Sequence, residues 1–179
     1  MPLSVVFVLV AVVSFAAAAP FILTVRREPA VRSMLEKLPR ERISGTVLAA
    51  IALLWCVPNI RPIFMPDSPF QNFILPLILL SIVLAAIFLN YLFARAAAAI
   101  LILGAHAVLK AAYPAQLPGY PVLAALVLLA GVIGIVISAK PYWLRDWFRL
   151  SFRNSAVRWT SAAFFLLLGA MSCYCAVEA

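Results

Sequence analysis

Long apolar runs, separated by short polar segments, set the pattern of hydrophobic and polar positions along the chain. A membrane-spanning helix needs about 20 consecutive apolar residues. Runs of about this length cover residues 4–25, 43–60, 70–93, 96–113, 120–138 and 159–177. The pattern therefore predicts an all-α, polytopic integral membrane protein, with six transmembrane helices in a single transmembrane domain over residues 1–179.

The connections between the runs are short. The third and fourth runs are expected to meet at a tight turn around residues 94–95. Residues 58–62 and 114–119 are rich in proline, which cannot continue a hydrogen-bonded helix, so they are predicted loops. Pro20 and Pro76 fall inside apolar runs and predict kinks there.

Two polar segments, residues 30–38 and 142–153, have a helical spacing of apolar positions. The apolar positions of the first are Val31, Met34, Leu35 and Leu38, and those of the second are Trp143, Leu144, Trp147, Phe148 and Leu150. The pattern predicts two amphipathic helices lying in the membrane interface. In the second, Arg145, Arg149 and Arg153 recur every four residues on the opposite side. They are candidates for contact with an anionic lipid or a partner's acidic surface; simple anchoring and a solvated loop are the alternatives.

Composition supports the membrane interpretation. The chain is 66% apolar and 11% charged, against roughly 45–50% and about 25% in average soluble domains. These figures exclude a water-soluble globular domain, and they exclude a disordered chain because disorder needs low hydrophobicity. Lys and Arg outnumber Asp and Glu by 14 to 6. Because cytoplasmic loops of membrane proteins collect Lys and Arg, this excess indicates orientation in a membrane and no nucleic-acid partner.

The positions of the basic residues predict the orientation. Twelve of the 14 lie in residues 26–42, at Arg95 or in residues 140–158. These segments are therefore expected in the cytoplasm, with both termini outside it and the chain in the inner (cell) membrane. Residues 16–20 resemble a signal-peptide cleavage region. No Lys or Arg precedes that run, however, and Arg26 follows it, so a retained first span is expected.

Few residues in the apolar runs carry chemistry. The six acidic residues all fall in predicted loops or at ends, and the chain has one histidine. Neither a phosphate-binding glycine-rich loop nor a G-x-S-x-G motif is present. An enzyme is accordingly less expected than a non-catalytic protein, and neither a catalytic residue nor a metal or cofactor site is predicted.

His106 and Lys110 form the candidate functional polar face. They are four residues apart in the fourth run, so they share one face of a helix, with His106 near the membrane midplane. A hydrogen bond from His106 to a neighbouring helix is one interpretation. A proton relay or substrate contact is the other, because ionisable groups inside membranes are often functional.

Small residues and cysteines give two further expectations. Ala130, Gly134 and Ser138 form a stripe of small residues that predicts a close helix contact. The three cysteines, Cys56, Cys173 and Cys175, are expected to be free thiols. The alternatives are a Cys56–Cys173 bridge, a redox role, and a metal site shared with His106.

Taken as a whole, the sequence favours a non-catalytic membrane protein that serves as a subunit, scaffold or accessory of a larger membrane assembly. Its expected partners are the lipid bilayer, with anionic lipid as a candidate within it, and other membrane-protein subunits or a second copy of the chain. One alternative is a small-solute or proton-linked transporter or channel that uses the face of His106 and Lys110. The other is a membrane redox or lipid-modifying enzyme.

Overall fold

The computed structural model describes residues 3–23, 29–60, 70–115 and 119–178, and within these ranges every element is helical. The elements are α1 (Leu3–Leu23), α2 (Pro29–Lys37), the 3-10 helix η2 (Leu38–Arg40), α3 (Arg42–Ile60), α4 (Phe70–Phe88), α5 (Leu92–Ala115), α6 (Tyr120–Ala139), α7 (Tyr142–Arg153) and α8 (Ser155–Glu178). Four of them, α1, α5, α6 and α8, are long and apolar enough to cross a membrane. The apolar stretches of α3 and α4 are shorter. The described part of the chain is thus helical, with four candidate membrane-spanning helices.

The turn between α4 and α5 lies earlier than the sequence predicts. It occupies residues 89–91, and the predicted position around 94–95 is wrong because Ala94 and Arg95 belong to the first turns of α5. Tyr91, the residue directly before α5, adopts a left-handed conformation with φ 58° and so separates the two helices. The alanine-rich sequence after it has high helix propensity, so the new helix begins at once.

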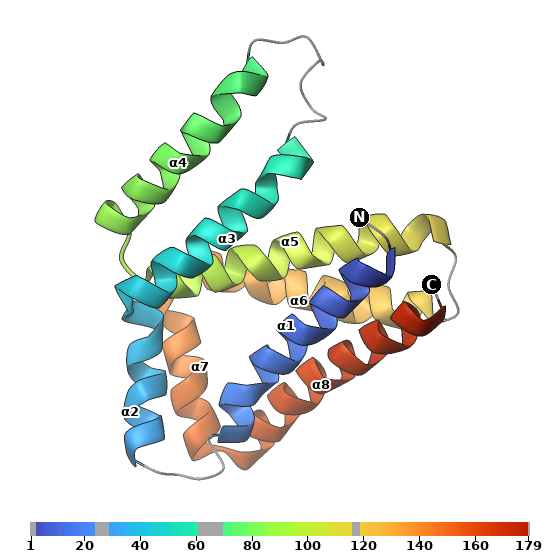
Figure 1. Cartoon of the computed structure of the whole chain (residues 1–179). Helices are drawn as coiled ribbons and strands as arrows, with labels where there is room; N and C mark the ends of the chain where they lie inside the picture. Colours follow the sequence, from blue (N-terminus) through green and yellow to red (C-terminus); the bar gives the residue numbers. More distant parts are fainter. Residues whose placement is uncertain (1–2, 24–28, 61–69, 116–118, 179) are drawn as a thin grey trace.

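The four long helices form two pairs, α1 along α8 and α5 along α6 (Figure 1). The pairs converge near the two termini, where Phe7, Val108, Leu123 and Cys175 belong to one buried cluster. They diverge toward the other end, where α7 and α2 lie across the gap between them (Figure 1). We call the end formed by α2, η2 and α7 the basic end.

Glycines allow the closest helix contacts. A Cβ atom on Gly134 would lie 2.9 Å from the carbonyl oxygen of Ala98, so α6 meets the backbone of α5 there. Of the small-residue stripe on α6, Ala130 and Gly134 are buried and Ser138 is exposed. A Cβ on Gly45 would lie 2.7 Å from the backbone nitrogen of Phe93, so α3 meets α5 equally closely.

The α3–α4 hairpin projects from the two helix pairs (Figure 1). Helix α4 packs on α3 and on no other described helix to a comparable extent. Its large apolar side chains are therefore mostly exposed, and Phe88 reaches 74% exposure. Pro20 and Pro76 both lie inside helices, in α1 and α4 respectively.

Candidate functional site

The basic end is built on three apolar side chains that anchor its helices to the bundle. Leu35 of α2 and Leu144 and Phe148 of α7 are buried in one cluster with Phe21 of α1. Trp147 donates a hydrogen bond from Nε1 to Ser161 Oγ of α8 at 3.0 Å. These contacts hold α7 against the ends of α1 and α8, and α2 packs beside α7.

Not all apolar positions of these two helices are covered by the rest of the protein. Met34 of α2 is 65% exposed. On α7, Trp143 and Leu150 are exposed while Ser151 is buried. Helix α7 therefore turns a narrow face toward the bundle, and two of its large apolar side chains remain uncovered by protein.

A groove of about 620 Å³ runs between α2, η2 and α7. It is lined by Ser33, Met34, Glu36, Lys37, Arg40, Glu41, Arg145 and Arg149, and we call it the basic groove. Four cationic side chains face two carboxylates, so its lining carries an excess of two positive charges.

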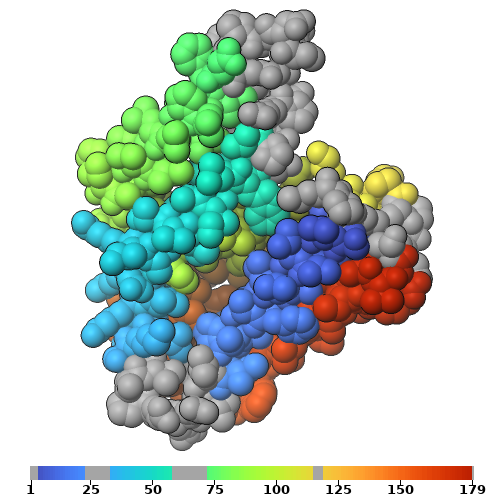
Figure 2. Space-filling model, viewed as in Figure 1, coloured from blue at the N-terminus to red at the C-terminus, as the bar shows by residue number. Residues whose placement is uncertain are grey.

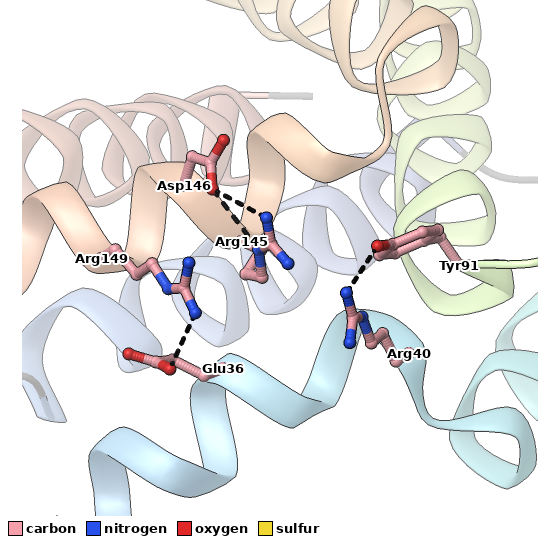
Figure 3. A network of polar contacts seen from close by, with 6 residues as sticks. All are labelled: Glu36, Arg40, Tyr91, Arg145, Asp146 and Arg149. Carbon is pink, nitrogen blue, oxygen red and sulfur yellow. Dashed lines mark hydrogen bonds and ion pairs between the residues drawn. The ribbon is translucent and has the colours of Figure 1, made fainter.

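Figure 3 shows the guanidinium groups of this region between α2, η2 and α7. Arg149 pairs with Glu36 at 3.3 Å, which links α7 to α2. Arg145 pairs with its neighbour Asp146 at 3.4 Å. Arg40 donates to the Tyr91 hydroxyl at 2.9 Å, so its contact here is with a neutral group rather than a carboxylate.

The three arginines singled out on α7 thus have different positions. Arg145 and Arg149 line the basic groove. Arg153, in the last turn of α7, is exposed and does not line it. Arg40 and Lys37 contribute to the groove although the sequence pattern singled out neither, since their convergence with α7 depends on the packing of α2.

A separate apolar cavity of about 300 Å³ lies where the two helix pairs diverge. Side chains of α1, α3, α5, α6, α7, α8 and η2 line it, among them Phe21, Leu38, Leu101, Leu144 and Trp147. Figure 2 shows the surface hollowed between α1 and α3, with orange-brown atoms of the α6–α7 region visible beneath. We call this volume the apolar cavity.

His106 and Lys110 are both exposed on α5, and neither lines the basic groove or the apolar cavity. A smaller groove between α3 and α5 is lined by Cys56, Ala99 and Leu103, among others. His106 and Lys110 follow Leu103 by three and seven residues, which places them further along the same face of α5. They therefore lie on the side where α3 diverges from α5.

Arg158 is buried near the start of α8, which begins four residues before the predicted apolar run at 159. It donates to Ser155 Oγ at 3.2 Å, and its guanidinium lies 5.7 Å from the Trp159 ring centre. No residue in the described ranges accepts a hydrogen bond from its Nε atom.

Within the described part of the chain, no three His, Cys, Asp or Glu side chains come together as a metal site. All three cysteines are free thiols, with Cys175 buried and Cys173 exposed on α8, and Cys56 half-buried on α3. Comparison with known proteins finds no matching family model, curated relative or solved structure.

Proposed function

We propose that this chain is a non-catalytic, six-span subunit or accessory protein of a larger inner-membrane assembly. In this proposal, a transmembrane helix of a partner packs against α5 beside the α3–α4 hairpin. The single observation that carries it is the exposure of His106 on a helix long and apolar enough to span the membrane.

His106 lies about 21 Å along α5 from Leu92, at 1.5 Å per residue. This places it in the middle third of a 24-residue helix. Ionisable side chains at such depths almost always face other helices or water, because hydrocarbon cannot solvate them. An imidazole on the outer surface of the isolated chain therefore indicates that another helix covers it in the membrane.

The position of the α3–α4 hairpin is a second observation that favours a partner helix beside α5. Helix α3 diverges from α5 and leaves an angle between them (Figure 1). The helical spacing from Leu103 places His106 and Lys110 on this side of α5. A helix placed in this angle would also cover exposed apolar side chains of the hairpin. Polar side chains between helices contribute to association through hydrogen bonds.

The variant His106→Ala is expected to lower recovery of the partner by roughly threefold or more, since one interhelical hydrogen bond is lost. The measurement is the amount of partner that copurifies per copy of this chain in mild detergent. Thr160→Ala is the matched control: Thr160 is also exposed on a long apolar helix, but its hydroxyl bonds the carbonyl of Ala156 in its own helix. Equal recovery in both variants would contradict the proposed contact.

The proposed topology places the basic end in the cytoplasm and both termini outside. It is supported by the position of α2, η2 and α7 at one end of the bundle, where basic side chains gather. In this arrangement α3 and α4 also cross the membrane, and α2 and α7 lie in its inner interface. Cytoplasmic segments rich in Lys and Arg fit the positive-inside rule.

Cysteine labelling tests this topology. In a cysteine-free background, Lys37→Cys and Asn154→Cys are expected to resist an impermeant maleimide added to intact cells, because both lie at the basic end. Glu178→Cys, at the end of α8, is expected to react. Labelling of Lys37→Cys or Asn154→Cys from outside would overturn the orientation.

A further inference from the structure

The basic groove presents cations that its own carboxylates do not neutralise. Glu36 pairs with Arg149, and Glu41 accepts a hydrogen bond from Ser44 at 3.1 Å. The Arg145 side chain is 22% exposed and contacts only the adjacent Asp146 among the ion pairs of the described residues. An anion with several oxygen acceptors would complement this arrangement, because guanidinium groups bind phosphate through paired hydrogen bonds.

The apolar cavity suits a different kind of ligand from the basic groove. Its volume of about 300 Å³ is at the lower limit of the roughly 300–1,000 Å³ found for small-molecule sites. Its lining is almost wholly apolar and includes the aromatic rings of Phe21, Trp147 and Phe165. Such a volume favours a hydrocarbon chain over a polar solute.

The two volumes adjoin through consecutive residues. In the chain, Lys37 lines the basic groove and the next residue, Leu38, lines the apolar cavity. On α7, Leu144 lines the cavity and Arg145 lines the groove. Residues of η2 and α7 that line the apolar cavity are therefore direct chain neighbours of cations that line the basic groove.

We propose that the basic end binds one anionic phospholipid, with its phosphate in the basic groove and one acyl chain in the apolar cavity. A phospholipid is the occupant that joins both chemistries in one molecule, and the opening between α1 and α3 gives its chain a lateral path from the bilayer (Figure 2). This inference goes beyond the proposed subunit role and does not depend on it.

Trp147 provides a direct test, because its side chain lines the apolar cavity. A variant retaining only this tryptophan is made with Trp55, Trp143 and Trp159 replaced by phenylalanine. It is reconstituted in phosphatidylcholine vesicles that contain a few mole per cent of lipid with brominated acyl chains, which quench tryptophan on contact. Brominated phosphatidylglycerol is expected to reach half-maximal quenching at about a tenfold lower mole fraction than brominated phosphatidylcholine.

Two matched arginine substitutions distinguish binding of anionic lipid at a defined site from a general attraction of anionic lipid to the basic surface. Arg145→Gln is expected to raise about fivefold the mole fraction of brominated phosphatidylglycerol that gives half-maximal quenching. Arg153→Gln, on the same helix but outside the groove, is expected to leave this mole fraction unchanged. Ala97→Leu, which adds volume to the cavity lining, is expected to weaken quenching with the groove intact.

Equal quenching by the two brominated lipids, or equal losses in the two arginine variants, would overturn the proposal. Unchanged quenching in Ala97→Leu would mean that the acyl chain does not occupy the apolar cavity, and this result would also contradict the proposal. If the single-tryptophan protein does not fold, native mass spectrometry of the chain with all four tryptophans tests the same proposal. Retention of one phosphatidylglycerol, lost in Arg145→Gln and kept in Arg153→Gln, is the expected result.

Discussion

Gly134→Val is expected to lower the free energy of unfolding by about 3 kcal/mol, the upper part of the range for overpacked interiors. The added Cβ would lie 2.9 Å from the carbonyl oxygen of Ala98 and 3.0 Å from Cγ1 of Ile102. A backbone carbonyl cannot turn aside as a side chain can, so α6 would have to shift away from α5. The measurement is thermal unfolding in detergent, followed with a maleimide dye that becomes fluorescent when buried cysteines are exposed.

Two other glycines serve as controls for Gly134→Val. Gly104, in α5, has open space where a Cβ would be, so Gly104→Val is expected to leave the melting temperature nearly unchanged. At Gly169 the obstacle is the ring of Phe15, at 2.8 Å. Because that ring is a side chain, Phe15→Leu is expected to rescue Gly169→Ala. Equal destabilisation at positions 134 and 104 would contradict the close packing of α5 and α6.

Gly45→Val is expected to separate the α3–α4 hairpin from α5. Its Cβ would lie 2.7 Å from the backbone nitrogen of Phe93 and 3.2 Å from the Leu92 carbonyl carbon. The clash is expected to lower the free energy of unfolding by about 3 kcal/mol. If detaching α3 from α5 costs less than this, α3 is expected to detach locally instead. Reactivity of the native Cys56 thiol, which lines the groove between α3 and α5, should therefore rise before the rest of the protein unfolds.

The control for this experiment is Gly104→Val, which lies on α5 but meets no neighbouring atom. Its Cys56 reactivity is expected to match that of the wild type. If Gly45→Val leaves Cys56 as protected as in the wild type, then Gly45 is not where α3 is held against α5.

Hydropathy and helical spacing predicted most helices, because each depends on local sequence. The helix at 142–153 has the predicted limits, and α6 ends one residue beyond the predicted run. The turn before α5 was misplaced because residues 89–93 are mostly apolar and only the conformation of Tyr91 marks the break. Hydropathy cannot detect a turn inside a continuous apolar stretch.

The candidate sites depend on tilt and pairing, which apolar patterns do not determine. All spans present similar apolar surfaces, so the divergence of the two helix pairs, and with it the apolar cavity, was not predictable. The arginines of α7 were found from their spacing, whereas Arg40 joins them only because η2 packs beside α7. The exposure of His106 likewise depends on how the neighbouring helices pack against α5.

Photo-crosslinking at position 106 in living cells tests the proposed subunit role most directly. A photoreactive amino acid replaces His106, and the same replacement at Leu128, which is exposed on α6, measures contact with lipid. We expect a crosslink from position 106 to one defined membrane protein, with no such product from position 128. A second copy of this chain as the product would make the assembly a homo-oligomer in which α5 faces α5 or the hairpin. Crosslinks to lipid alone from both positions would contradict the account, because His106 would then face the bilayer without a covering helix.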